Sequence, residues 1–116
     1  MKKVYYLSTC NTCKRIMDEL GDKLHDFEQQ DIKTNKITGE QIDQMGALAE
    51  NFESLFSRKA MKYRSMGLGE KNLTESDYRQ LIVDEYTFLK RPVFIVGDQI
   101  FIGNSKKVIA ALSAVL

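Results

Sequence analysis

A pair of cysteines, Cys10 and Cys13, stands where a short apolar stretch gives way to a helical pattern. Residues 3–7 are mostly apolar and β-prone, which predicts a buried strand. From Asn11 onward, apolar residues return at the three- and four-residue spacing of a helix, and Gly21 predicts where that helix ends. The two thiols are therefore expected at the junction between a strand and the first turn of a helix.

The two ends of the chain predict strands with different connections. A second strand is predicted over residues 24–28, and the order strand, helix, strand implies a parallel pair joined by a right-handed crossover. Near the C-terminus, residues 92–96 and 99–102 predict a β-hairpin around the Gly97-Asp98 turn. Ser105 then caps a closing helix. The predicted inner residues of this helix are Val108, Ile109, Leu112 and Val115.

The middle of the chain is predicted to be helical. Thr38 and Gln41 have the spacing of a capping box at the start of one helix, and Thr74 predicts the start of another. Residues 51–56 predict a short helical turn between them. The predicted inner faces hold Ile42, Met45 and Leu48 in the first helix, and Tyr78, Leu81, Ile82 and Tyr86 in the second. The length of 116 residues predicts one domain over residues 1–116.

Composition and charge exclude several classes of protein. The chain has 17 basic and 16 acidic residues and a net charge of +1, so no global charge attracts it to nucleic acid or to an anionic membrane. No apolar run approaches the roughly 18 residues that a spanning helix needs, and the N-terminal apolar stretch is too short for a signal peptide. We therefore expect a cytoplasmic protein that binds neither nucleic acid nor membrane directly.

The cysteine pair is the main indication of chemistry. A helix N-terminus carries unpaired N–H groups and a partial positive charge, and both favour a thiolate at Cys10. Cys13 lies one turn further along, within reach for a disulfide, and Lys14 adds positive charge. In a reducing compartment such a pair is typical of a redox site. The alternatives are two small buried apolar residues, or half of a zinc site shared between two chains, because two cysteines and a distant His25 do not form a tetrahedral site.

Two arginines adjoin apolar segments. Arg58 follows Leu55-Phe56, and Arg91 precedes Pro92 and the predicted hairpin. A guanidinium matches an oxyanion bidentately, so the two would form an oxyanion clamp if the fold brings both to the Cys10 loop. Otherwise each is an ordinary solvated surface residue.

Three segments of the chain share their order and spacing with one known family. They are Tyr5-Tyr6-Leu7-Ser8-Thr9-Cys10-Asn11-Thr12-Cys13-Lys14-Arg15, then Leu55-Phe56-Ser57-Arg58-Lys59 with Tyr63 and Met66-Gly67-Leu68, and Leu89-Lys90-Arg91-Pro92-Val93-Phe94-Ile95 with Ile102-Gly103. Together they resemble the arsenate reductase (ArsC) and Spx family of the thioredoxin-like superfamily. The resemblance implies an α/β fold with a four-stranded mixed sheet flanked by helices. A helical insertion at about 38–88 would separate a βαβ half from a ββα half, and Pro92 would be a cis-proline facing the cysteine loop.

The resemblance also implies a site. Cys10 matches the nucleophilic cysteine of the family, and Arg58 and Arg91 match two arginines that hold the oxyanion in arsenate reductases. In those enzymes the cysteine attacks arsenate, glutathione resolves the thiolate–arsenic adduct, and glutaredoxin reduces the mixed disulfide. The substrate-binding residues would be Asn11, Thr12, Lys14, Arg58, Arg91 and Pro92. We expect no bound cofactor and no metal, with glutathione, glutaredoxin or thioredoxin as the electron donor.

Two features of the chain separate two functional hypotheses. Cys13 stands where the glutathione-coupled arsenate reductases have another residue, and segment 102–107 lacks the arginine that follows their last strand. The first hypothesis is an ArsC-family thiol oxidoreductase, nominally an arsenate reductase, with Cys13 as a resolving thiol. The alternative is an Spx-like transcriptional regulator, switched by a Cys10–Cys13 disulfide, that binds the RNA polymerase α subunit. A third is a family member that binds glutathione without arsenate chemistry. We expect a monomer acting on a small oxyanion or thiol.

Overall fold

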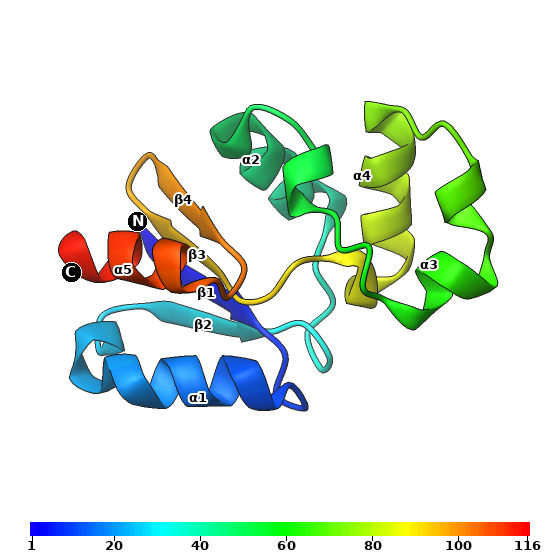
Figure 1. The fold of residues 1–116 in the computed structure, drawn as a ribbon. Coiled ribbons are helices and arrows are strands. Elements are labelled where there is room, and N and C mark those ends of the chain that lie inside the picture. Colours follow the sequence, from blue (N-terminus) through cyan, green and yellow to red (C-terminus); the bar gives the residue numbers. More distant parts are fainter. The chain divides into compact units, whose positions relative to one another are not determined.

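The structure is a computed structural model that describes residues 1–116 (Figure 1). Its strands are β1 (Lys2–Tyr6), β2 (Glu28–Asp31), β3 (Val93–Val96) and β4 (Gln99–Ile102). Its α-helices are α1 (Asn11–Leu20), α2 (Gly39–Ala49), α3 (Met61–Ser65), α4 (Glu75–Asp84) and α5 (Lys106–Ala114). Short 3₁₀ helices are η1 (Gly21–Leu24), η2 (Glu53–Leu55), η3 (Leu68–Glu70) and η4 (Tyr86–Phe88). Contacts divide the chain into two compact units, the sheet unit (Met1–Lys36 with Arg91–Leu116) and the helical unit (Ile37–Lys90).

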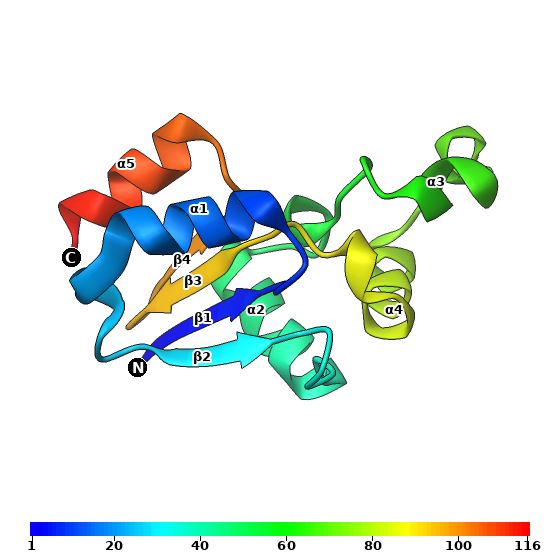
Figure 2. The same ribbon diagram turned by 90° about the horizontal axis from the view of Figure 1, so that it is seen from below.

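The sheet unit holds a four-stranded mixed sheet with the order β2-β1-β3-β4. β1 pairs parallel with β2 and antiparallel with β3, and β3 pairs antiparallel with β4. Val4 lies opposite Gln29 on one side and Phe94 on the other, and Phe94 lies opposite Phe101. Figures 1 and 2 show α1 and α5 on the same face of this sheet. The predicted α/β fold, with a four-stranded mixed sheet flanked by helices, is confirmed.

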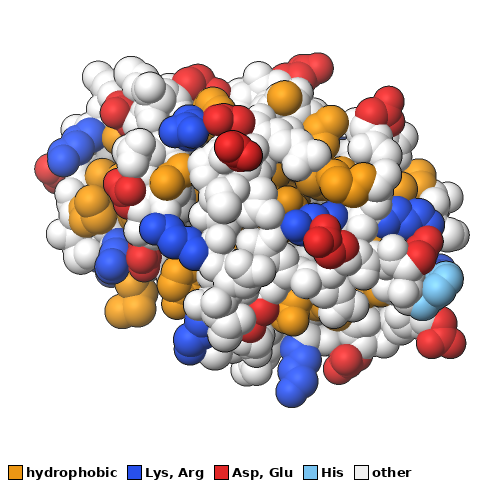
Figure 3. All heavy atoms as spheres, turned by 180° about the vertical axis from the view of Figure 1, so that it is seen from behind, with side chains coloured by type: hydrophobic (Ala, Val, Ile, Leu, Met, Phe, Trp, Pro, Cys, Tyr) orange, Lys and Arg blue, Asp and Glu red, His pale blue; other side chains and the backbone are white.

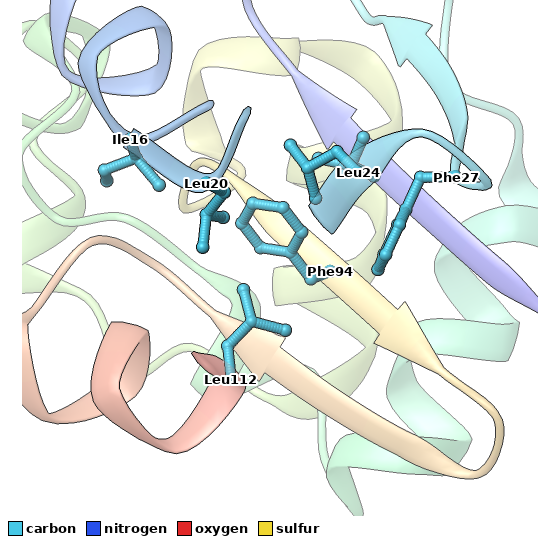
Figure 4. Packing of buried hydrophobic residues seen from close by; sticks show 7 residues of the cluster. Ile16, Leu20, Leu24, Phe27, Phe94 and Leu112 are labelled. Atoms are coloured by element: carbon cyan, nitrogen blue, oxygen red, sulfur yellow. The ribbon is translucent and has the colours of Figure 1, made fainter. Parts of the chain in front are cut away.

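One apolar cluster fixes α1 and α5 on the sheet. Its buried members are Val4, Ile16, Leu20, Leu24, Phe27, Phe94 and Leu112. Phe94 lies among them (Figure 4), and its ring forms a T-shaped pair with the Phe27 ring, with 6.1 Å between the centroids. Ile16 and Leu20 are four residues apart, so α1 presents both on one face to the sheet. This packing determines where the first turn of α1, and therefore Cys10, lies relative to β1.

The helical unit contains two helices with complete capping boxes. Thr38 caps α2 and Thr74 caps α4, each together with the third residue of its helix, which confirms the predicted helix starts. An ion pair between Arg79 on α4 and Asp43 on α2 joins the two helices, with 2.6 Å between Nε and Oδ1. Phe56 is the central ring of this unit. It meets the rings of Tyr63, Tyr78 and Phe88.

The predicted strand at residues 24–28 is wrong in its position. Gly21–Leu24 forms a 3₁₀ helix, and the strand covers Glu28–Asp31 instead. Leu24 and Phe27 both enter the core cluster, and their three-residue spacing belongs to a helical turn rather than to a strand. β2 is an edge strand of sequence Glu-Gln-Gln-Asp in which only Gln30 is buried. No apolar alternation therefore marks it in the sequence.

Two residues assigned to inner helix faces are placed differently. Val115 is 43% exposed, because α5 ends at Ala114 and Val115 is already its C-terminal cap. Tyr86 lies beyond the end of α4 at Asp84, in the 3₁₀ helix η4. Tyr86 is half-buried through its place in η4, and it does not continue the three- and four-residue spacing of the inner face of α4.

Replacing Gly46 with alanine is expected to lower stability by about 1–2 kcal/mol in urea unfolding. A Cβ at this position of α2 would lie 2.5 Å from a ring carbon of Phe52, so the ring must move. Moving the ring is expected to cost about 2–3 kcal/mol, which exceeds the roughly 1 kcal/mol that alanine gains over glycine in a helix. The matched control is Gly69→Ala, whose Cβ would meet Tyr63 at an ordinary 3.6 Å. A stabilised Gly46→Ala protein would contradict this packing.

The surface mixes charges of both signs. The face in Figure 3 shows positive, negative and hydrophobic side chains interspersed, in keeping with the net charge of +1. The one histidine, His25, is exposed there, and its Nδ1 lies 2.8 Å from the Asp22 carbonyl oxygen. No helix combines the length and the apolar character needed to cross a bilayer.

Candidate active site

Cys10 lies at the start of α1, in the loop that leads out of β1. It is the N-cap residue of the helix, and its Sγ accepts the N–H of Cys13 across 3.5 Å. Its own N–H donates to the Leu7 carbonyl at 2.9 Å and closes the loop. The sulfur therefore occupies the place where a serine or aspartate oxygen usually receives the unpaired N–H groups of a helix start.

The surroundings of Cys10 favour its thiolate. Partial burial opposes the charge, but hydrogen bonds from the N–H and the thiol of Cys13 outweigh it, together with the charge of Arg91 and the N–H of Thr12. They hold the pKa of Cys10 below its ordinary value. Cys10 is half-buried, so the sulfur is not sealed off from solvent. Since the thiolate is the nucleophilic form of cysteine, this arrangement raises the reactivity of Cys10.

Cys13 has the opposite environment. Its side chain is fully buried, and burial raises the pKa of Cys13 to about 12. The hydrogen bond and the charge of Cys10 add to this shift, while the Leu7 N–H and the charge of Arg91 oppose it. Both cysteines are free thiols in the structure. No group of three or more His, Cys, Asp or Glu side chains is placed to hold a metal ion.

Replacing Cys13 with alanine is expected to raise the pKa of Cys10, because the thiol that donates to its sulfur is lost. Serine keeps a donor on the same Cβ, so Cys13→Ser should preserve more of the lowered pKa than Cys13→Ala does. The measurement is the rate of Cys10 alkylation by iodoacetamide against pH, which falls as the pH drops through the pKa. Identical profiles for the two variants and the wild type would show that this hydrogen bond does not influence Cys10.

Arg91 and Pro92 directly precede β3 in the C-terminal part of the sheet unit. The bond between them is cis, as the family resemblance implies. Arg91 is half-buried, and its positive charge lowers the pKa of both cysteines. The loop after β4 holds this segment, since the Gly103 N–H donates to the Pro92 carbonyl at 2.9 Å and the Asn104 amide donates to the Arg91 carbonyl at 3.4 Å. Gly103 has a φ of 88°, which favours glycine.

Arg58 belongs to the helical unit. Its Nη2 donates to Glu53 Oε2 at 2.9 Å and to the Tyr78 hydroxyl at 3.0 Å. The exposed side chain also lines an open hollow of about 780 Å³, whose wall includes Lys59, Tyr63 and Arg64. The sheet unit thus contains Cys10, Cys13 and Arg91, whose charge acts on both thiols, and it also contains Pro92. Arg58 lies within the helical unit, bonded to Glu53 and Tyr78.

The other predicted substrate residues follow Cys10 on α1. Thr12 is half-buried, and its N–H contributes to the lowered pKa of Cys10. Asn11 and Lys14 are exposed, and both line a shallow hollow along α1. These three residues therefore offer one backbone donor to the Cys10 sulfur, from Thr12, and two exposed polar side chains in the first turn of α1.

Sequence reasoning missed Asp31. Its Oδ1 accepts the N–H of Ser8 at 3.2 Å and the N–H of Lys33 at 3.1 Å, so it holds the beginning of the cysteine loop. Asp31 is the last residue of β2, the strand that the apolar pattern placed too early. The signal that could have found it is a short carboxylate at the start of a polar turn, where aspartate accepts the N–H two residues on.

Comparison with known proteins identifies the family. The model of the ArsC family matches residues 5–112. The chain belongs to the ArsC family. It is 23% identical over 104 residues to the uncharacterized protein YusI of Bacillus subtilis, covering 85% of this chain and 86% of YusI. It is 22% identical over 112 residues to the global transcriptional regulator Spx of Streptococcus agalactiae, covering 96% of this chain and 82% of Spx.

A solved structure shows the same fold as this ArsC-family chain. The crystal structure of a possible arsenate reductase from Streptococcus mutans matches it with a TM-score of 0.77 at 24% identity, covering 97% of this chain and 98% of that one. At this level of identity the likeness establishes the fold, which is the thioredoxin-like fold of ArsC structures. The predicted membership in the ArsC and Spx family is confirmed.

Proposed function

We propose that this ArsC-family protein is a thiol oxidoreductase in which Cys10 is the nucleophile and Cys13 is the resolving thiol. The observation that carries the proposal is the difference between the two sulfurs. The pKa of Cys10 is lowered at a half-buried helix start, and the pKa of the fully buried Cys13 is raised to about 12. A pair in which one thiol ionises more readily and the other stays protonated is suited to sequential attack, because only one sulfur competes for the substrate.

With arsenate as the nominal substrate, the reaction has two steps. The Cys10 thiolate attacks arsenic(V), a sulfur–arsenic bond forms, and one arsenate oxygen leaves as water after protonation. Cys13 then loses its proton and attacks the Cys10 sulfur, so that a disulfide forms and the sulfur–arsenic bond breaks. The electron pair of that bond stays with arsenic, which leaves as arsenite. Thioredoxin, or glutaredoxin with glutathione, supplies two electrons to restore both thiols.

The change in charge at Cys10 helps the second step. In the free protein, the negative charge of Cys10 is one cause of the raised pKa of Cys13. When the Cys10 sulfur is bonded to arsenic, that charge is no longer on the sulfur. The part of the raised Cys13 pKa that comes from the Cys10 thiolate is then reduced, whereas the part that comes from burial, the largest cause, remains.

The oxyanion is proposed to be held by charge and by backbone donors. Arg91 supplies a guanidinium within the sheet unit, and Arg58 is proposed as a second guanidinium on the family resemblance alone. The N–H groups of the first turn of α1 and the side chains of Asn11 and Lys14 complete the proposed substrate site, with Pro92 at its edge. Preorganised donors of this kind stabilise the charge that develops on the arsenate oxygens.

The test is arsenate-dependent disulfide formation in the purified protein, with arsenite release measured in the presence of thioredoxin or of glutaredoxin and glutathione. Arg91→Ala should slow the reaction by roughly a hundredfold. Arg79→Ala removes an arginine that pairs with Asp43 in the helical unit, and it should leave the rate unchanged. A folded wild-type protein that forms no arsenite with either donor would exclude arsenate as the substrate.

An Spx-like regulator is the second candidate function. Two observations favour it: the Spx proteins to which the chain is similar, and the Cys10–Cys13 pair itself. In this role the disulfide would act as a switch for binding the C-terminal domain of the RNA polymerase α subunit. Capture of that domain should differ between the oxidised and reduced protein, and equal absence of capture in both states would exclude this role. In either role we propose a cytoplasmic monomer without a bound cofactor.

A further inference from the structure

Asp31 accepts a hydrogen bond from the short segment Leu7-Ser8, which precedes the cysteine pair. Its Oδ1 accepts the N–H of Ser8 at 3.2 Å. The neighbouring residue, Leu7, bonds the first cysteine directly, because its carbonyl accepts the Cys10 N–H at 2.9 Å. The N–H of Leu7 also acts to lower the pKa of Cys13. A single carboxylate oxygen is therefore linked, through the backbone of Ser8 and Leu7, to Cys10, whose sulfur in turn accepts the N–H of Cys13.

We infer that Asp31 is a positioning residue, which sets the spacing and reactivity of the Cys10–Cys13 pair through Ser8 and Leu7. The inference rests on the proposed function, in which these thiols act as nucleophile and resolving thiol. Ser8 is exposed and lies in a turn, so its own side chain is not held by core packing and the Asp31 bond ties it to β2, whereas Leu7 beside it is buried. Without the tether, the loop gains freedom and the two sulfurs spend less time at the separation that a disulfide requires.

The charge of Asp31 and its hydrogen bonds have opposite effects on the site. Partial burial opposes the Asp31 charge, but hydrogen bonds from Ser8 and Lys33 outweigh it and lower the pKa of Asp31, so it is a carboxylate at neutral pH. A carboxylate near a thiolate disfavours the thiolate by charge, whereas an ordered loop favours it. The two effects are separable because the Ser8 and Lys33 bonds meet on the same oxygen, Oδ1. Asparagine keeps that oxygen and removes the charge.

The experiment compares Asp31→Asn, Asp31→Ala and Asp31→Glu with the wild type. One readout is the pH profile of Cys10 alkylation by iodoacetamide. The other is the rate of Cys10–Cys13 disulfide formation with diamide, which accepts the two electrons and two protons of the closing disulfide. Loss of a charge-assisted hydrogen bond should slow closure about tenfold in Asp31→Ala and raise the pKa of Cys10. Asp31→Asn should close within about twofold of the wild-type rate, because its Oδ1 accepts the same bonds.

Asp31→Glu and one further variant, Asp26→Ala, separate the positioning effect from folding defects. Asp31→Glu keeps the charge but displaces the oxygen by one methylene, so closure should slow as in Asp31→Ala. Asp26→Ala removes a carboxylate that pairs with Lys2 at the opposite end of β1, and both readouts should be unchanged. Thermal unfolding of each variant identifies any that is not folded.

Several results would overturn the inference. If Asp31 acted by charge alone, Asp31→Asn and Asp31→Ala would both lower the pKa of Cys10, and Asp31→Glu would match the wild type. Suppose that Asp31→Ala and Asp31→Glu both close the disulfide at the wild-type rate, while Cys10 of the wild type is reactive. The positioning role of Asp31 would then be excluded, and the proposed function would stand. A wild-type Cys10 that reacts no faster than a free cysteine at pH 7 would overturn the proposed function and this inference with it.

Discussion

Replacing Cys10 with serine is expected to abolish arsenite formation, with a loss of at least about a thousandfold in the rate of turnover. A serine hydroxyl does not ionise in this pH range, so the donors that lower the pKa of Cys10 have no thiolate to stabilise. The measurement is single-turnover arsenite release with each electron donor. Because serine is a favourable N-cap residue, the start of α1 should be preserved and the loss will not come from unfolding.

Cys13→Ser is the matched variant for this experiment. It keeps the Cys10 nucleophile and lacks the resolving thiol, so the protein should form the arsenic adduct once and release no arsenite without an added thiol. Glutathione would then restore part of the turnover. Turnover in Cys10→Ser within tenfold of the wild type would show that Cys10 is not the nucleophile.

Replacing Phe94 with alanine is expected to cost about 3–5 kcal/mol of stability, measured by urea unfolding followed by circular dichroism. Phe94 is fully buried on the central strand β3 and lies among the residues that α1 and α5 contribute to the core (Figure 4). Truncation removes the buried apolar ring and its T-shaped contact with Phe27. It also leaves a cavity beneath the helix that carries Cys10.

The controls for Phe94→Ala vary size and burial separately. Phe94→Leu fills most of the volume and should lose less than half as much stability. Val115→Ala removes apolar atoms from a residue that is 43% exposed at the end of α5, and it should change stability by no more than about 0.5 kcal/mol. A loss below about 1 kcal/mol in Phe94→Ala would mean that the cluster does not depend on this ring.

Local signals predicted most of the fold correctly. The β3–β4 hairpin turns at Gly97-Asp98, where Gly97 has the positive φ that the turn requires. The helix starts at Thr38, Thr74 and Ser105 follow from short side chains that accept N–H groups of their own first turns. Each of these features depends on residues within a few positions of one another, so the pattern along the chain contains it.

Features determined by distant neighbours were predicted less well. β2 was misplaced because it is a polar edge strand, and its pairing with β1 is made by the backbone rather than by an apolar face. The tether from Asp31 to Ser8 was missed for the same reason, since it depends on where β2 ends. Similarly, the exposure of Val115 depends on where α5 stops packing on the sheet and not on the apolar character of the residue.

The sequence by itself determined that a thiol lies at a helix N-terminus, because strand, loop and helix signals around Cys10 are all local. Only the tertiary structure decided that the two thiols differ. Cys13 is fully buried by residues from other elements, which raises its pKa, while Cys10 stays half-buried beside donors and within the field of Arg91. Burial and charge act through space, so the same four residues Cys10-Asn11-Thr12-Cys13 acquire one reactive and one protonated thiol only in the folded chain.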